Sequence, residues 1–259
     1  MSIPDFASPD FANSDRADAV LEQMARHRSV RDFAPDPLDD ATIERAVAAA
    51  QCAATSSWIQ AYHLLQVTDA DERARLAELT GGQRQVAEAG AFFVVAGDTR
   101  RHRLIAAREG KPYVQSLEVF LLAAIDASLF AQNLTLAFES LGKGVCYIGG
   151  LRNDLPSVDA LLEIPEGVYP LFGLCVGTPK SDPGTRPRFA PNAVWSKGRY
   201  PSDDEVLHSI EDHDGDASEY YARRGAAGRN WSGGTWRKFA RPMRVGLRGY
   251  YEGKDASFE

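Results

Sequence analysis

The chain has 259 residues, 44% of them hydrophobic, which is enough to bury a substantial core in one large domain or two small ones. Its 29 basic and 36 acidic residues give a net charge of −7, which argues against a protein that coats nucleic acid. The three cysteines are far apart and form no CxxC motif, which argues against a disulfide framework or a zinc site and favours a reducing, cytoplasmic compartment.

Residues 1–14 are polar, and we predict a flexible N-terminal arm there, without the basic start and apolar run of a secretory signal. Apolar periodicity and turn residues predict the elements that follow. In chain order these are a helix from Ser14 to near Arg26, a helix capped by Asp39 or Asp40, strand His63–Val67, helix Asp71–Leu79, strand Ala91–Ala96, helix Leu117–Leu141, strand Val145–Ile148, helix Asp154–Leu162 and strand Leu171–Val176. With no repeat and no long linker, one domain with a three-layer character is expected.

The predicted helix Leu117–Leu141 is apolar nearly all round, which raises the question of a membrane span. Charged residues such as Glu118 and Asp126 interrupt it, and charges at that depth in a bilayer are costly. We therefore predict a buried helix, enclosed by the sheet, by other helices or by a partner chain, and no membrane association.

After the last predicted strand, we expect a loop over residues 178–201, a charged helical tail up to Arg224 and an irregular stretch from Gly225 to Gly234. His208 and His213 lie among acidic residues at a spacing that suits a solvated loop better than a metal site. The motifs GxGxxG, GxxxxGK[ST], GxSxG and HExxH do not occur in a suitable context. Because no nucleophile or acid–base constellation stands out, a cofactor is expected to carry any chemistry.

A basic segment at residues 27–31 suits a phosphate group, because arginine forks and a hydroxyl match phosphate oxygens. It contains His27, Arg28, Ser29 and Arg31. The alternative is a helix C-terminus decorated with cations. A second basic pair, Arg186 and Arg188, flanks a proline, and its alternative interpretation is an ordinary solvated loop.

Three further segments offer, in turn, glycines that let the backbone approach a flat ring, an amide that can donate and accept, and hydroxyls for ring carbonyls or ribityl oxygens, although each also fits a common turn or loop. They are Tyr147-Ile148-Gly149-Gly150-Leu151, Gly81-Gly82-Gln83 and Thr55-Ser56-Ser57. The order HRSVR, TSSW, TGGQ, ESLGKGVCYIGGLRND, PLFGLCVGTP and RPR, from about Asp15 to about Pro242, resembles the flavin-dependent nitroreductase family. The resemblance is closest to its larger, NADPH-preferring branch of oxygen-insensitive nitroreductases and flavin reductases.

The resemblance implies an α+β fold, a three-layer sandwich with a mixed central sheet, formed by residues 15–259 as a single domain with a C-terminal wrap-around extension. It implies a homodimer with the long helix in the interface and FMN bound between the chains. The implied FMN contacts are His27, Arg28, Ser29, Arg31, Arg186 and Arg188 at the phosphate and ribityl end, and Tyr147, Ile148, Gly149, Gly150, Leu151, Thr55, Ser56, Ser57 and Gln83 at the ring, some of them from the partner chain. The implied substrate or NADPH contacts are Trp58, Arg224, Arg229 and Arg241.

The implied activity is ping-pong transfer of two electrons from NADPH through FMN to nitroaromatics or quinones, with no catalytic side chain and no metal. Two alternatives remain: an NADPH-dependent FMN reductase that supplies reduced flavin, and a non-catalytic flavin-binding or sensor protein. The sequence departs from the family pattern at Arg186, where lysine is frequent, at Ala54, where serine is frequent, and in a short glycine-rich stretch at 225–234.

Overall fold

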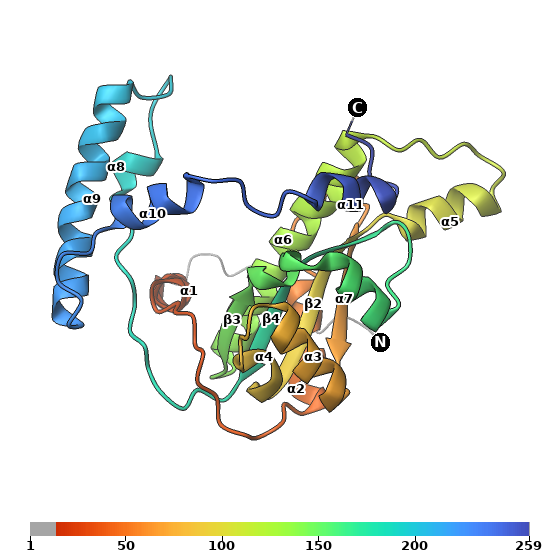
Figure 1. Cartoon of the computed structure of the whole chain (residues 1–259), viewed down its shortest axis with the longest axis horizontal. Coiled ribbons are helices and arrows are strands. Elements are labelled where there is room, and N and C mark those ends of the chain that lie inside the picture. The colour runs from red at the N-terminus through yellow and green to blue at the C-terminus, as the bar shows by residue number, and fades with distance from the viewer. Residues whose placement is uncertain (1–13, 259) are drawn as a thin grey trace. The chain divides into compact units, whose positions relative to one another are not determined.

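The computed structural model describes residues 14–258 (Figure 1). Apart from Ser14, the first residue of α1 (Ser14–Ala25), the predicted arm over residues 1–14 lies outside this range. The chain divides into two compact units, which are described separately. The core unit contains the chain up to Pro183 together with Gly246–Glu259, and the second unit is Gly184–Val245.

A four-stranded sheet forms the centre of the core unit, with the strand order β1-β2-β4-β3. The strands are β1 (Tyr62–Val67), β2 (Ala91–Asp98), β3 (Gly144–Ile148) and β4 (Val168–Gly177), and each neighbouring pair is antiparallel. The predicted strands are confirmed within a few residues. The sequence analysis predicted a mixed sheet. The four strands pair antiparallel with one another, and an isolated bridge between Ser29 and Val145 adds a parallel pairing.

Alternating side chains of β2 enter two separate cores, because successive residues of a strand point to opposite faces. Phe93 and Val95 pack with α2 (Asp40–Ala50) and α6 (Leu117–Ser140). Phe92 and Val94 pack on the opposite face, where α3 (Ala70–Leu79), α4 (Gln85–Glu88) and α7 (Leu155–Leu162) contribute. The sheet therefore lies between two helical layers, which confirms the predicted three-layer sandwich.

Local capping explains where several helices of the core unit begin. Asp39 accepts a hydrogen bond from the Thr42 amide at 2.8 Å, so Asp39 rather than Asp40 caps α2. The remaining elements are α5 (Arg100–Arg108), α11 (Leu247–Gly253) and two short 3₁₀ turns, η1 (Ser56–Trp58) and η2 (Gly149–Asn153).

The long helix α6 packs on the sheet with one face and leaves a stripe of leucine and isoleucine exposed. These residues follow every fourth position, so they share one side of the helix. They are Leu117, Leu121, Ile125 and Leu129, with exposed fractions of 39%, 42%, 53% and 42%. By length and composition α6 could cross a bilayer, yet its packing on the sheet makes it a core helix of this unit.

The second unit confirms the charged helix predicted up to Arg224 and adds two short helices that the sequence analysis did not predict. It contains α8 (Pro191–Val194), α9 (Asp203–Arg223) and α10 (Trp231–Phe239). The loop predicted around His208 and His213 is wrong, because both residues lie in α9, which a capping box between Ser202 and Glu205 starts. The irregular stretch predicted up to Gly234 is wrong at its end, where Asn230 caps α10.

Candidate functional site

The basic segment at residues 27–31 lies in extended form beside β3. The Val30 amide donates to the Val145 carbonyl at 2.9 Å, and Ser29 forms a parallel bridge to Val145. The Val30 side chain also occupies the space above Gly144, where an added Cβ would come within 2.8 Å of it. Beyond Val30 the segment passes to the residues that follow β4, where the Lys180 amide donates to the Asp32 carbonyl at 3.0 Å and the Ala34 amide donates to the Thr178 carbonyl at 2.9 Å.

The two arginines of this segment differ in their partners. The Arg28 Nε donates to Asp182 Oδ1 at 2.7 Å, so this guanidinium is already paired. Arg31 is exposed, forms no ion pair with any residue in the described part of the chain, and donates to the Ser29 carbonyl at 3.3 Å. Its charge opposes the effect of burial, which raises the pKa of the Cys146 thiol. Arg31 is thus the more available cation for an anionic ligand.

His27 is held by a carboxylate that the sequence analysis did not single out. Its Nδ1 lies 2.7 Å from Glu139 Oε1, near the C-terminal end of α6. The Glu139 side chain is only 8% exposed, and its other oxygen is buried without a hydrogen-bond partner. The contact at Nδ1 leaves the Nε2 of His27 for another group.

The glycine-rich ends of two segments meet at this side of the sheet. A Cβ on Gly150 would lie 2.4 Å from the Thr80 carbonyl oxygen and 2.5 Å from Gln83 Nε2, so only glycine fits there. The Gln83 amide donates to the Thr80 carbonyl at 2.9 Å, which fixes its orientation. Gly81 and Gly82 have positive φ angles of 92° and 74°. The structure therefore brings the predicted TGGQ and YIGG segments together.

Two of the predicted ring contacts need correction. The Ile148 and Leu151 side chains are fully buried in the core, so only their backbone atoms can approach a ligand. Tyr147 is partly buried, and its hydroxyl accepts a hydrogen bond from Thr135 at 3.0 Å. Burial raises the pKa of the Tyr147 hydroxyl, and the nearby Glu139 charge raises it further. Its phenol therefore stays protonated at neutral pH.

The hydroxyl-rich loop lies far from the basic segment within one chain. Thr55, Ser56 and Ser57 precede β1, whereas the basic segment runs beside β3, and these strands are opposite edges of the sheet. At about 4.8 Å per strand, the edges are about 14 Å apart. Trp58, at the tip of this loop, is 81% exposed.

The remaining predicted site residues belong to the second unit. Arg186, Arg188, Arg229 and Arg241 are exposed and form no ion pair with other residues that the structure describes. Arg224, also exposed, lies over the Tyr220 ring at 5.4 Å. The contacts predicted between these residues and FMN or NADPH stay predictions.

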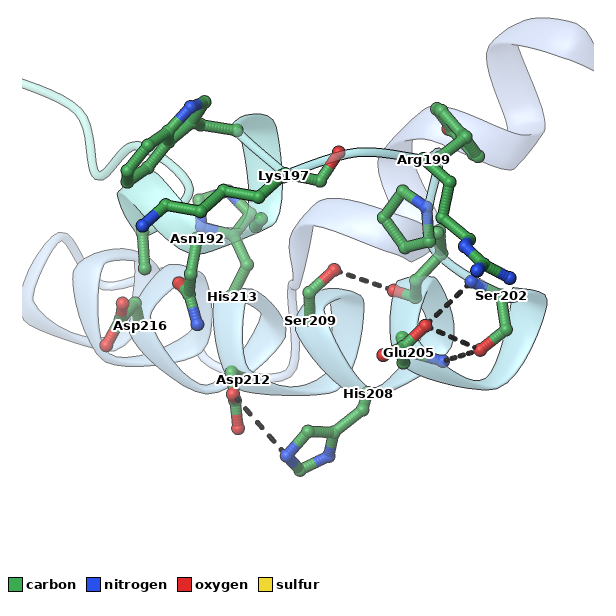
Figure 2. A pocket seen from close by; sticks show the side chains of 17 residues that line it. Asn192, Lys197, Arg199, Ser202, Glu205, His208, Ser209, Asp212, His213 and Asp216 are labelled. Atoms are coloured by element: carbon green, nitrogen blue, oxygen red, sulfur yellow. Dashed lines mark hydrogen bonds and ion pairs between the residues drawn. The ribbon is translucent and has the colours of Figure 1, made fainter.

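A cavity of about 770 Å³ lies within the second unit, between the first half of α9 and the segment before it (Figure 2). None of the residues predicted to bind FMN lines it. His213 contributes to its wall, with its ring stacked on Phe189 at 4.1 Å and its buried Nδ1 without a hydrogen-bond partner. No group of three metal-binding side chains occurs among the described residues.

Residues 24–178 match the family model "Nitroreductase family", and residues 186–258 match "Nitroreductase family, C-terminal domain". The chain is 38% identical to the FMN reductase (NADPH) of Bacillus subtilis over 219 residues, which are 82% of this chain and 88% of that protein. It is 39% identical to the oxygen-insensitive NADPH nitroreductase of Salmonella typhimurium over 217 residues, 84% and 87% of the two chains.

The solved structure of the NADPH:FMN oxidoreductase from Vibrio harveyi in complex with NAD+ resembles this chain with a TM-score of 0.83 and 33% identity. The aligned region covers 92% of this chain and 98% of the Vibrio harveyi chain. The family models together span both compact units, and the fold agrees over nearly the whole length. The chain therefore belongs to the nitroreductase family.

Proposed function

We propose that the chain is an FMN-dependent NADPH oxidoreductase that passes two electrons to nitroaromatic or quinone acceptors. Membership of the nitroreductase family and relatives named as NADPH-dependent FMN reductases and nitroreductases support this activity. The observation that carries the proposal is Arg31, an exposed cation without an ion pair among the described residues, in the extended segment whose Ser29 bridges Val145 of β3.

The donor set beside β3 fits the phosphate and ribityl part of FMN. Arg31 offers a planar fork for phosphate oxygens, Ser29 adds a hydroxyl, and His27 has its Nε2 free of the Glu139 contact. Arg28 would join them by releasing or sharing Asp182. Arg186 and Arg188 of the second unit would close over the phosphate, as the family resemblance implies.

The glycine-rich segments fit the flavin ring, because backbone without side chains allows a flat group to approach closely. Gly149, Gly150 and the backbone of Ile148 would lie along the ring, with the fixed Gln83 side chain and Tyr147 at its border. When bound, FMN supplies the hydride chemistry between NADPH and the acceptor. The protein's residues bind and orient the reactants, and they keep cationic and N–H groups near the ring.

We further propose a homodimer in which each flavin site contains residues of both chains. The exposed stripe of α6 and the exposed apolar side chains Val20, Leu21 and Met24 of α1 are the surfaces that a second copy would cover. Because the loop with Thr55, Ser56 and Ser57 lies at the opposite sheet edge from the basic segment, it would reach the ring bound by the partner chain. Trp58 would border the acceptor position.

Arg224 and Arg229 are proposed to meet the extra phosphate of NADPH, and Arg241 to face the substrate cavity. A cytoplasmic location completes the proposal, in keeping with the spaced cysteines.

The second candidate function is an FMN reductase that releases reduced FMN as its product. The ion pair between Arg28 and Asp182 favours it, because this pair competes with the phosphate for one of the two arginines.

The decisive experiment is a visible spectrum of the purified protein, followed by anaerobic titration with NADPH and then with a nitroaromatic compound. We expect NADPH to bleach the flavin and the nitroaromatic to restore its colour. A flavin spectrum that persists in excess NADPH would contradict both reductase candidates. The Kd of FMN, measured separately, distinguishes a resident cofactor from an exchanged substrate.

A further inference from the structure

A buried carboxylate in the middle of α6 holds the hydroxyl-rich loop. Asp126 is only 1% exposed. It accepts hydrogen bonds from the Thr55 hydroxyl at 2.5 Å, the Ser56 amide at 3.1 Å and the Ala61 amide at 3.0 Å. A buried carboxylate is costly unless donors satisfy it, and here the donors come from one short loop. Asp126 therefore acts on the shape of residues 55–61.

That loop has a strained backbone. Ser57, Trp58 and Gln60 have φ angles of 48°, 59° and 51°, in the left-handed region that favours glycine. Strained residues persist only where their surroundings determine them, and they cluster at functional sites. The Thr55 hydroxyl also accepts from the Gln60 amide at 2.8 Å, so a chain of hydrogen bonds runs from Asp126 through Thr55 to Gln60.

The strain is not compensated by packing at the tip of the loop. Trp58 is 81% exposed, and Ser56 and Ser57 are exposed as well. A loop that folded only for stability would bury its tryptophan, which is the largest apolar side chain. The hydrogen bonds of Asp126 thus hold a conformation that presents Ser56, Ser57 and Trp58 outward.

We infer that Asp126 is a positioning residue, which holds the loop 55–61 in its left-handed turn so that it completes the flavin site of the partner chain. This inference rests on the proposed function. Asp126 is buried, and it follows Ile125 of the exposed stripe in the sequence of α6. The same helix therefore carries the proposed dimer surface and fixes the loop, which ties the shape of the site to the interface.

The test replaces Asp126 by asparagine, which keeps the shape but exchanges one accepting oxygen for a donating amide. We expect hydrogen exchange of the Ser56 and Ala61 amides to become at least about tenfold faster, since each loses or weakens its acceptor. We expect the Kd of FMN to rise about tenfold, the size of effect that one or two lost hydrogen bonds produce.

The matched control is Asp159→Asn, which alters another largely buried carboxylate, bonded to Tyr250 and Lys254 rather than to residues 55–61. It should lower the melting temperature without changing FMN affinity or exchange at Ser56. Thr55→Val removes the hydroxyl that joins Asp126 to Gln60 and should reproduce the Asp126→Asn result in smaller degree, which covers the case of a poorly folding Asp126 variant.

The outcomes separate the two proposals. If the native protein does not bind FMN, the proposed function fails. If the native protein binds FMN and Asp126→Asn binds it within twofold, with unchanged amide exchange in the loop, the positioning role is wrong while the proposed function stands. Equal losses of FMN affinity in Asp126→Asn and Asp159→Asn would show a general effect on stability and would also overturn the positioning role.

Discussion

Two regions of the core unit are tied to α6 by buried carboxylates, and they are tied differently. Asp126 receives three hydrogen bonds from the loop 55–61 and holds it in a strained turn. Glu139 makes one contact with His27 of the basic segment and keeps a buried oxygen without a partner. The loop is therefore fixed before any ligand arrives, whereas the basic segment keeps hydrogen-bonding groups available for a ligand. A fixed loop suits contact with a flat ring, and a basic segment with available donors suits a phosphate group.

The largest effect is expected from a change that removes both regions from the site at once. Ile125→Glu combined with Leu129→Glu places charges in the exposed stripe of α6 and should prevent dimer formation. If each site needs both chains, the monomer should also lose its flavin. Analytical ultracentrifugation and the ratio of flavin to protein absorbance measure the two effects. The control is Leu104→Glu, an equally exposed leucine on α5; a flavin-loaded monomer would contradict the two-chain site.

Arg31→Ala should weaken binding of the FMN phosphate by the basic segment without changing the conformation of the loop 55–61. Loss of a charge-assisted contact predicts a rise of about 30-fold in the Kd of FMN. Riboflavin, which lacks the phosphate, should bind the variant and the native protein equally. Arg75→Ala, which breaks an exposed ion pair within α3, is the matched control. Unchanged FMN affinity in Arg31→Ala would remove the phosphate assignment.

Glu139→Gln tests whether the single carboxylate contact of the basic segment matters to the ligand. We expect about a fivefold loss of FMN affinity, because His27 loses the anion that orients its ring. A double-mutant cycle with His27→Gln should show strong coupling between the two residues. Additive losses in the double variant would mean that Glu139 does not act through His27.

The smallest effect is expected outside both regions. Arg224→Ala should raise the KM of NADPH about threefold and leave the KM of NADH nearly unchanged, because only NADPH carries the extra phosphate. Steady-state kinetics with both nucleotides measure the ratio. Equal changes for the two nucleotides would remove Arg224 from the proposed NADPH contact.

Elements with local sequence signals were predicted correctly, whereas the roles of side chains whose partners are distant in the sequence were not. The apolar run of β2 and the Asp39 cap of α2 are local, and both are confirmed. Asp126 and Glu139 looked like charges that interrupt an apolar helix, because their partners Thr55 and His27 are 71 and 112 residues away in the chain. The charged helix up to Arg224 is confirmed as α9, which a local capping box starts, whereas the acidic neighbours of His208 and His213 wrongly suggested a loop at these two residues.

The central claim is that one flavin site combines the basic segment 27–31 of one chain with the loop 55–61 of the other. It can be tested in mixed dimers, purified through two different tags, with Arg31→Ala in one chain and Asp126→Asn in the other. One site then carries both changes and the other carries neither, so FMN titration should find one site of native affinity per dimer. Two weakened sites and none of native affinity would show that both residues serve the same chain, and would contradict the account.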